Sequence, residues 1–599
     1  MDLLKSKMRE HGRILHLLFI LAVSFHFLLD SPGVSAETES AYPTCAASDR
    51  ATLLSFKSSI LRDTTGFLST WVGEDCCGAW EGIQCDTKTG RVIVLQLQAG
   101  SDGTSFMKGV LSPSLGNLEF LQVMLISGKQ IMGPIPESIS KLSSLTQLYL
   151  EDNMLGGSIP SSLGKLTLLE ALSLSGNRLG GVVPPELGSL KNLVQINLGK
   201  NVLTGGIPST LGKLRRLESL DLCSNSLSGH IPDFFGELKN LKYIDLSDNE
   251  FSGSLPNSIS NLPYIHSLIL NNNHLTGELP RQIGNLRSLC TLSVSQNLLT
   301  GTIPDSLSRL PNLWHLNLSR NGFSDPLPAS LAQGMPSLLR IDLSYNNLHL
   351  GSVPAWIANR ELRDVHLAGC RIEGPLPHFS NASSLNSIDL SDNSLTGQIG
   401  NFFVSMTSLD TAKLSNNMLE SDVSGIILPS GLSLIDMHSN RLYGSISAFI
   451  TNNIGKFLEI VNLSWNRIEG TLPEFRQGSN LRSLDLCSNR IAGTIPNSMS
   501  NLVNLRRLDI SRNNIQGNIP ANLGQLQSLE WLDVSTNRLG GNIPKTLGSL
   551  RHANFRSNYL CGQIPQKRPF NVFPAAAYAH NQCLCGAPLP SCSRTELQR

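Results

Sequence analysis

The sequence predicts an α/β fold: a right-handed, curved solenoid with short parallel strands on its concave face and a disulfide-bonded cap at each end. A pattern L-x-x-L-x-L-x-x-N-x-L-x-G-x-I-P returns about every 24 residues from Leu121 onward, in eighteen consecutive units. Eight of the 12 cysteines lie near the two ends of this repeated region. The 599 residues exceed the ~250–300 that one globular core supports, whereas stacked units have no such limit.

Each unit is expected to begin with a strand, and the period lies within the roughly 20–29 residues of leucine-rich repeats. Alternation directs Leu148 and Leu150 inward and Gln147 outward. The asparagine that follows, Asn153 in this unit, is expected to be buried and to satisfy backbone groups that the turn leaves unpaired. The return path carries Gly and Pro, and residues 162–166 are expected to form one helical turn on the outer face.

Sixteen of the eighteen units carry the asparagine, and Lys129 and Cys370 replace it in the other two. A degenerate unit begins at Val92 and a shortened one ends near Pro565, which makes about twenty units in residues 91–565. The strands pack closer together than the return segments, so the stack is expected to curve and to present its strands as a binding surface.

Residues 1–36 have the three parts of a secretory signal: a basic start, an apolar run from Ile14 to Leu29 and small residues before a cleavage site after Ala36. An uncleaved membrane anchor is the alternative, because the apolar run approaches the ~17 residues needed to span a bilayer. His16 and His26 weaken that alternative. No later stretch is apolar enough to cross a membrane, so we expect a secreted protein of the extracellular space or cell wall.

The L-x-G-x-I-P ending resembles the plant-specific class of leucine-rich repeats. That class occurs in the extracellular parts of receptor-like kinases, in receptor-like proteins and in polygalacturonase-inhibiting proteins. The sequence D-R-A-T-L-L-S-F-K and the cysteines of residues 37–90 look like the N-terminal cap of this family. The sequence L-C-G-A-P-L-P and the cysteines around residues 566–599 resemble its C-terminal cap, followed by a short tail.

The resemblance implies two disulfides in the N-terminal cap, and we extend the scheme to the other cap, although four C-terminal cysteines allow three connectivities. The expected pairs are Cys45–Cys76, Cys77–Cys85, Cys561–Cys583 and Cys585–Cys592. The other cysteines, such as Cys223 and Cys487, lie singly in different units. Since neighbouring strands are ~4.8 Å apart, these two are separated by roughly 50 Å and neither bond to each other nor share a metal.

The composition excludes several functions. The formal net charge is +1, so the chain has no general attraction for a nucleic-acid backbone. The Gly164-Lys165 pair lacks the glycine that a phosphate-binding loop requires, and no H-E-x-x-H, G-x-S-x-G or protein-kinase signature is present. We therefore expect a protein without catalytic activity, cofactor or metal.

Aspartate recurs at the outward strand position. These residues are Asp221, Asp245, Asp342, Asp389, Asp436, Asp485, Asp509 and Asp533. An acidic ladder could attract a basic ligand, but L-D-L-S is the usual strand of the family, and a structural role is favoured. Arg482, Arg506, Arg507 and Arg512 are expected to lie close enough to neutralise the last of them.

Departures from that usual strand are the candidate binding residues, because exposed aromatic and unusual side chains bury a large area at little entropic cost. They are Tyr149, Tyr243, His266, Ile269, His315, Tyr345, His366, Lys413, His438, Trp465 and Trp531. Any one of them could be ordinary surface variation. As a set they favour binding between Tyr243 and Trp465.

Three N-x-S/T sites are candidates for glycosylation: Asn317, Asn381 and Asn462. Asn381 belongs to a return segment, whereas Asn317 and Asn462 are expected on the concave strands. Glycans there would restrict the ligand to the region between them or to one rim.

The leading hypothesis is an extracellular recognition module similar to receptor-like proteins, acting in plant defence or developmental signalling. It would bind an extracellular protein, peptide or glycan, with a membrane receptor kinase as co-receptor, which would also associate it with the cell surface. The alternative is an inhibitor of a secreted cell-wall-degrading enzyme such as polygalacturonase. The chain has about twice the repeats expected of that inhibitor group.

Overall fold

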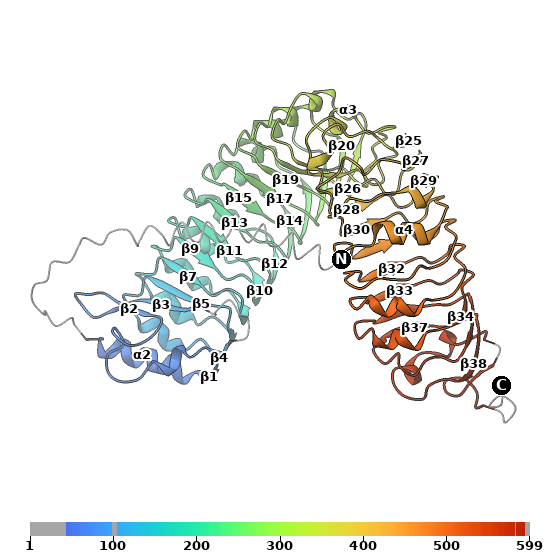
Figure 1. The fold of residues 1–599 in the computed structure, drawn as a ribbon. Coiled ribbons are helices and arrows are strands. Elements are labelled where there is room, and N and C mark those ends of the chain that lie inside the picture. The colour runs from blue at the N-terminus through green and yellow to red at the C-terminus, as the bar shows by residue number, and fades with distance from the viewer. Residues whose placement is uncertain (1–43, 99–104, 582, 593–599) are drawn as a thin grey trace, which may run out of the picture.

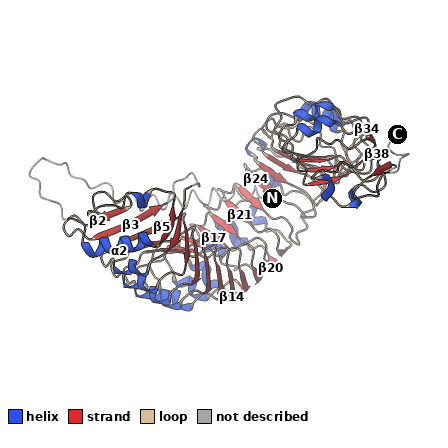
Figure 2. Ribbon diagram, turned by 90° about the horizontal axis from the view of Figure 1, so that it is seen from below, coloured by secondary structure: helices blue, strands red, loops and turns tan. Residues whose placement is uncertain are grey.

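The computed structural model describes residues 44–98, 105–581 and 583–592. The expected signal segment 1–36 and the tail 593–599 lie outside the described residues. The chain forms one continuous arch of stacked coils that runs from an N-terminal cap to a C-terminal cap, and the right-angle view shows that the stack also twists (Figures 1 and 2). Within the described part, no helix has the length and apolar character needed to cross a membrane.

The concave face is one sheet of 21 strands, in which the antiparallel β2 pairs with β3 and every later strand pairs in parallel with the next. Its strands are β2 (Ile83–Cys85), β3 (Val92–Gln98), β5 (Val123–Ser127), β7 (Gln147–Tyr149), β9 (Ala171–Ser173), β11 (Gln195–Asn197), β13 (Ser219–Asp221), β15 (Tyr243–Asp245), β17 (Ser267–Ile269), β19 (Thr291–Ser293), β21 (His315–Asn317), β23 (Arg340–Asp342), β24 (Asp364–His366), β26 (Ser387–Asp389), β28 (Thr411–Lys413), β30 (Leu434–Asp436), β31 (Ile460–Asn462), β32 (Ser483–Asp485), β33 (Arg507–Asp509), β35 (Trp531–Asp533) and β37 (His552–Asn554).

A second strand follows the asparagine in many units, whereas the sequence pattern predicted only one strand per unit. It builds an 11-stranded sheet and two shorter ones. The strands are β1 (Ile60–Asp63), β4 (Met107–Val110), β6 (Gln130–Gly133), β8 (Met154–Ser158), β10 (Arg178–Val182), β12 (Val202–Gly205), β14 (Ser226–His230), β16 (Glu250–Ser254), β18 (His274–Gly277), β20 (Leu298–Thr302) and β22 (Gly322–Ser324), then β25 (Glu373–Pro375), β27 (Ser394–Gly397) and β29 (Met418–Leu419), and finally β34 (Gln516–Asn518), β36 (Arg538–Gly541), β38 (Tyr559–Gln563) and β39 (Cys583–Cys585). The L-x-G segment of these units is extended, and its backbone groups form hydrogen bonds with the next unit. The 24-residue period of the sequence does not by itself predict this pairing.

Short helices return the chain on the outer side, and the expected turn at 162–166 is the 3₁₀ helix η4 (Ser161–Lys165). The α-helices are α2 (Ala47–Ser58), α3 (Ala355–Ala358) and α4 (Ile446–Asn453). The other 3₁₀ helices are η1 (Phe67–Ser69), η2 (Pro113–Asn117), η3 (Glu137–Lys141), η5 (Pro185–Ser189), η6 (Ser209–Lys213), η7 (Asp233–Glu237), η8 (Asn257–Asn261), η9 (Ile283–Asn285), η10 (Asp305–Arg309), η11 (Ala329–Ala332), η12 (Ala382–Ser384), η13 (Val423–Gly425), η14 (Asn497–Asn501), η15 (Ala521–Gln525), η16 (Phe570–Val572) and η17 (Ala575–Ala577).

The buried asparagines connect successive coils, as the sequence predicts. Asn177 Nδ2 donates to the carbonyl of Leu150 in the preceding unit at 2.9 Å and to that of Leu174 in its own unit at 3.0 Å. Its Oδ1 accepts the backbone N–H of Leu155 at 3.0 Å. The same bonds recur along the stack and continue through Asn558 in the shortened last unit to Asn581, which lies beyond the units recognised in the sequence.

The two units without the asparagine are completed differently. The Cys370 thiol donates weakly to the carbonyl of Leu343 at 3.5 Å, which retains one link to the preceding coil. Lys129 is 3% exposed, and its ammonium lies 5.2 Å from the ring centroid of Phe67 in the N-terminal cap. Cys370 therefore keeps a contact with the preceding coil, and Lys129 contacts the N-terminal cap.

The caps close the hydrophobic core, which otherwise consists mostly of Leu and Ile side chains with almost no exposed surface. In the N-terminal cap Trp71 stacks on Trp80 with ring centroids 5.4 Å apart. Disulfides join the two pairs that the resemblance implied, Cys45–Cys76 and Cys77–Cys85, and the two C-terminal pairs to which the scheme was extended, Cys561–Cys583 and Cys585–Cys592. Cys561 and Cys583 are register partners of β38 and β39, so this disulfide fastens the cap to the last coil.

Candidate binding surface on the concave face

The strand register aligns equivalent residues into columns across the concave sheet. We call the first residue of each three-residue strand the first column and the third residue the third column. His315, Arg340 and Asp364 are consecutive in the first column. In the third column His366 lies between Asp342 and Asp389. A third set, the turn column, is the residue immediately before each asparagine position, where the backbone is left-handed.

The predicted binding residues fall into these columns but form no single compact cluster. Tyr243, His315 and Trp531 belong to the first column, and His266 precedes its strand. The third-column members are Tyr149, Ile269, His366 and Lys413. Tyr345 and Trp465 stand in the turn column with φ of 55° and 56°, and His438 lies between the strand and that column. The surface is therefore a strip along the arch.

The aspartate ladder has a structural role. In β15 the Asp245 carboxylate accepts hydrogen bonds from the backbone N–H and the hydroxyl of Ser247, at 2.9 and 2.6 Å, and so closes the end of the strand. The remaining seven aspartates likewise accept the N–H two residues on: Asp221, Asp342, Asp389, Asp436, Asp485, Asp509 and Asp533. This geometry favours the structural interpretation of the ladder over a ligand-binding one.

Several of these carboxylates also have a cationic neighbour in an adjacent strand. Lys413 Nζ lies 3.4 Å from Asp389. Arg507 lies 3.5 Å from Asp485 and 3.4 Å from Asp509, so it neutralises the ladder as expected. Arg482 instead pairs with Glu459, and Arg512 lies 5.7 Å from the ring centroid of Trp465. Of these three arginines, only Arg507 makes the predicted contact with the ladder.

The centre of the arch holds a partly buried polar cluster around two histidines. Burial, and next the charge of Arg340, lowers the pKa of His315 to about 4. Burial also opposes charge on His366, but Asp342, whose Oδ2 lies 3.9 Å from His366 Nδ1, and the surrounding carboxylates outweigh burial and raise its pKa. The ring nitrogen Nε2 of His366 lies 2.9 Å from Ser387 Oγ. Two imidazoles whose pKa values are shifted in opposite directions thus lie two strands apart on the same sheet.

Tyr345 belongs to a fixed network in the turn column. Its ring spans Gly369, where a Cβ would come within 2.8 Å of the ring, and its hydroxyl donates to Asp392. Asn416 Nδ2 holds the other oxygen of Asp392 at 2.8 Å, and the Arg320 guanidinium lies 4.5 Å from the ring centroid. The exposed aromatic surface is therefore pre-organised for contact.

Sequence reasoning missed several members of this surface. Trp314 precedes β21, and the Arg340 guanidinium lies 5.4 Å from its ring centroid. The His552 ring stacks on the Trp531 ring with the ring centroids 3.5 Å apart. Arg507, from the neighbouring strand β33, also lies over the Trp531 ring. Arg320 and Asp392 also went unnoticed, because each acts through Tyr345, which is 25 residues from Arg320 and 47 residues from Asp392. Scanning the turn column at the repeat period would have found them.

Two acid and thiol groups have ligand atoms within 4.8 Å of one another: Asp221, Cys223, Asp245 and Asp485, Cys487, Asp509. Burial raises the pKa of the Cys487 thiol to about 12 and that of Cys223 further still. A metal requires the thiolate, so these thiols are poor ligands at physiological pH. The cysteines outside the caps, including Cys290 and Cys370, are free.

The predicted glycosylation sites have different surroundings. Asn381 is exposed in a return segment before η12. Asn317 and Asn462 occupy the third column in β21 and β31, and both are partly buried on the concave face. The Asn462 amide lies 3.3 Å from His438 Nδ1. Their modification remains a prediction.

Comparison with known proteins agrees with this architecture. Models of the leucine-rich repeat N-terminal domain, the leucine-rich repeat region and the leucine-rich repeat match residues 46–86, 202–391 and 479–539. The solved PEPR1–AtPEP1 structure has a TM-score of 0.63 and 31% identity, and the similarity covers 87% of this chain and 80% of that one. The chain belongs to the plant extracellular leucine-rich-repeat proteins.

The Arabidopsis receptor kinase HAESA, solved with the peptide hormone IDA and the co-receptor SERK1, has a TM-score of 0.58 and 29% identity. That similarity covers 90% of this chain and 98% of that chain. Receptor-like protein EIX2 of Solanum lycopersicum is 37% identical over 120 residues, which are 19% of this chain and 12% of EIX2. The matched segments span about a third or less of the curated relatives. These similarities support an extracellular or cell-surface protein.

Proposed function

We propose that this protein is a receptor-like recognition module that binds a secreted peptide or protein along its concave face, without catalysis, in plant defence or development. The observation that carries the proposal is the ordered strip between Tyr243 and Trp465, where partly exposed aromatic rings are held beside charged groups. Tyr345 and Trp465 are 37% and 56% exposed although their neighbours hold them in place. Pre-positioned aromatic side chains are the usual anchors of recognition surfaces.

A partner kinase is part of the proposal. HAESA was solved in complex with a peptide hormone and a co-receptor together, and the chain described here offers a long concave face of the same fold. The apolar run at residues 14–29, with the small residues that follow it, supports delivery outside the cell. We therefore propose a secreted protein that reaches the cell surface by association with a membrane receptor kinase.

The test is affinity capture followed by quantitative binding. The tagged, secreted full-length protein is used to isolate apoplastic ligands and membrane kinases from intact tissue, and a captured peptide is then resynthesised and titrated. Substitution of Tyr345, His366 and Trp465 by alanine should weaken that binding by at least tenfold, because such anchors contribute ~2 kcal/mol or more. Exposed Tyr264, on the return side of a coil, provides the control Tyr264→Ala.

Unchanged affinity in the triple variant would contradict the assignment of the strip. An inhibition assay against secreted polygalacturonases separates this proposal from its alternative. Stoichiometric inhibition that survives the triple variant would favour the inhibitor function and place its contact surface elsewhere.

A further inference from the structure

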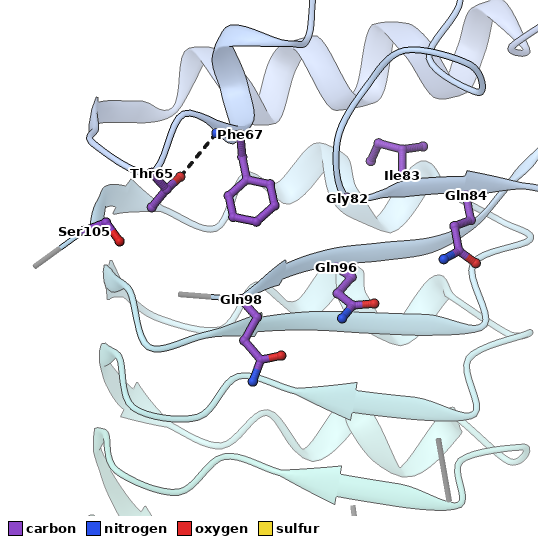
Figure 3. A pocket seen from close by; sticks show the side chains of 8 residues that line it. All are labelled: Thr65, Phe67, Gly82, Ile83, Gln84, Gln96, Gln98 and Ser105. Atoms are coloured by element: carbon purple, nitrogen blue, oxygen red, sulfur yellow. Dashed lines mark hydrogen bonds between the residues drawn. The ribbon is translucent and has the colours of Figure 1, made fainter. Parts of the chain in front are cut away.

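The concave face carries a cavity at its N-terminal end, outside the strip described above. It has a volume of about 600 Å³ and lies where the N-terminal cap meets the first strands. Figure 3 shows Gln84 on β2, Gln96 and Gln98 on β3, and the ring of Phe67 reaching toward them from the cap. Ligand sites typically measure roughly 300–1,000 Å³, so the size suits a small ligand or one end of a longer one.

The chemistry of the lining is uniform. None of the eight lining residues that the structure describes carries an ionisable side chain, and three of them are glutamines with exposed side chains. Among the described residues, the side-chain amides of Gln84, Gln96 and Gln98 make no hydrogen bond. Each amide offers two donor hydrogens and an acceptor oxygen, so it can pair with a hydroxyl in either role. Gln96 and Gln98 project from the same face of β3, about 7 Å apart.

The aromatic wall and the floor are held in place by the fold. The Lys129 ammonium, which occupies the asparagine position of its unit, lies 5.2 Å from the Phe67 ring centroid and is itself buried, so it orients the ring. Gly82 has φ of 83°, and a Cβ there would come within 2.4 Å of the Gln96 carbonyl oxygen. Only glycine permits this close approach, which keeps the floor of the cavity free of a side chain.

From these observations we infer that the cavity binds a neutral oligosaccharide. The hydroxyls of a sugar need neighbouring donors and acceptors, which the three amides supply, and the apolar face of a pyranose ring packs against an aromatic ring. A charged ligand would find no counter-charge among the eight described lining residues, which is unfavourable. The aspartate ladder of the concave face, with the arginines beside it, begins only at Asp221, which lies several strands further along the sheet.

The test titrates the secreted full-length protein with cellohexaose, chitohexaose and mannohexaose, and with hexagalacturonate as the charged comparison, by calorimetry. We expect at least one neutral hexasaccharide to bind with a stoichiometry of one. The double variant Gln96→Ala/Gln98→Ala and the single variant Phe67→Leu should each weaken that binding by at least tenfold. Gln516→Ala, which removes another exposed strand glutamine, should bind as the wild type does.

Three results would overturn the inference: no binding of any neutral hexasaccharide at millimolar concentration, unchanged binding in both cavity variants, or equally tight binding of hexagalacturonate that the same variants abolish. Thermal unfolding of each variant shows that it is folded. The triple variant of Tyr345, His366 and Trp465 should retain sugar binding, so failure of the central strip and failure of this cavity are distinguishable.

Discussion

Replacement of Asn249 by alanine tests the asparagine ladder that joins the coils. Asn249 Nδ2 donates to the carbonyls of Leu222, Leu246 and Ser247 at 3.0, 3.2 and 3.0 Å. Its Oδ1 accepts the N–H of Leu227 at 3.0 Å, and the side chain is buried. The substitution therefore removes four hydrogen bonds, of which those with Leu222 and Leu227 connect two coils.

The four bonds do not contribute equally. Each of the three carbonyls keeps another donor: Leu222 accepts from Asn225, Leu246 from Asn273, and Ser247 from the N–H of Ser224. The N–H of Leu227, by contrast, donates to Asn249 Oδ1 and loses this acceptor. A buried, unsatisfied N–H costs ~1–3 kcal/mol, and three weakened acceptors add a fraction of that. We expect a loss of about 2–3 kcal/mol.

The assay combines chemical denaturation with amide hydrogen exchange, because a solenoid can open locally and a single midpoint does not locate the change. Faster exchange should be confined to the coils around residues 222–251. The control Asn257→Ala removes an exposed asparagine in η8 and should stay within about 0.5 kcal/mol of the wild type. If Asn249→Ala were as mild as this control, the bridging role would be refuted.

Three further outcomes are expected. Imidazole titration by NMR should place His366 above pH 6.5, the ordinary value, and His315 near 4. The His366–Asp342 pair therefore stabilises the fold fully below pH 6.5, and this stabilisation is lost as the pH rises through the raised pKa of His366. The contribution of His315 has the opposite pH dependence: it is present above pH 6.5 and is lost as the pH falls toward 4. His366→Gln should abolish the first trend in denaturation midpoints, and a wild-type-like profile would contradict this assignment. Gly369→Ala should displace the Tyr345 ring, so it should reduce the affinity for a captured ligand at least as much as Tyr345→Phe does. If both variants bound the ligand as tightly as the wild type, the ring would have no role in binding. Peptide mapping after glycosidase treatment in heavy-oxygen water should label Asn381, the exposed site, more completely than Asn317 and Asn462; uniform labelling would show that partial burial does not limit modification.

The amino-acid sequence was sufficient for the repeated architecture, because each coil repeats the same local solution. Inward leucines, the turn asparagine and the outer helical turn depend on residues a few positions apart, and period alone locates them. The aspartate ladder is also local, since each carboxylate accepts an N–H two residues along the chain. The N-terminal cap cysteines pair as the family pattern implies, and the structure selects one of the three connectivities that the sequence left open for the C-terminal cap.

Only the tertiary structure decided which side chains act together. Tyr345 reaches Asp392 over Gly369, and Lys129 reaches Phe67 across the boundary between cap and repeats. The second sheet exists because extended return segments pair with one another. The cavity lined by Gln84, Gln96 and Gln98 exists because β2 turns back against β3. These contacts join residues at least about 20 positions apart in most cases. Their geometry depends on the stacking of whole coils, which no local pattern encodes.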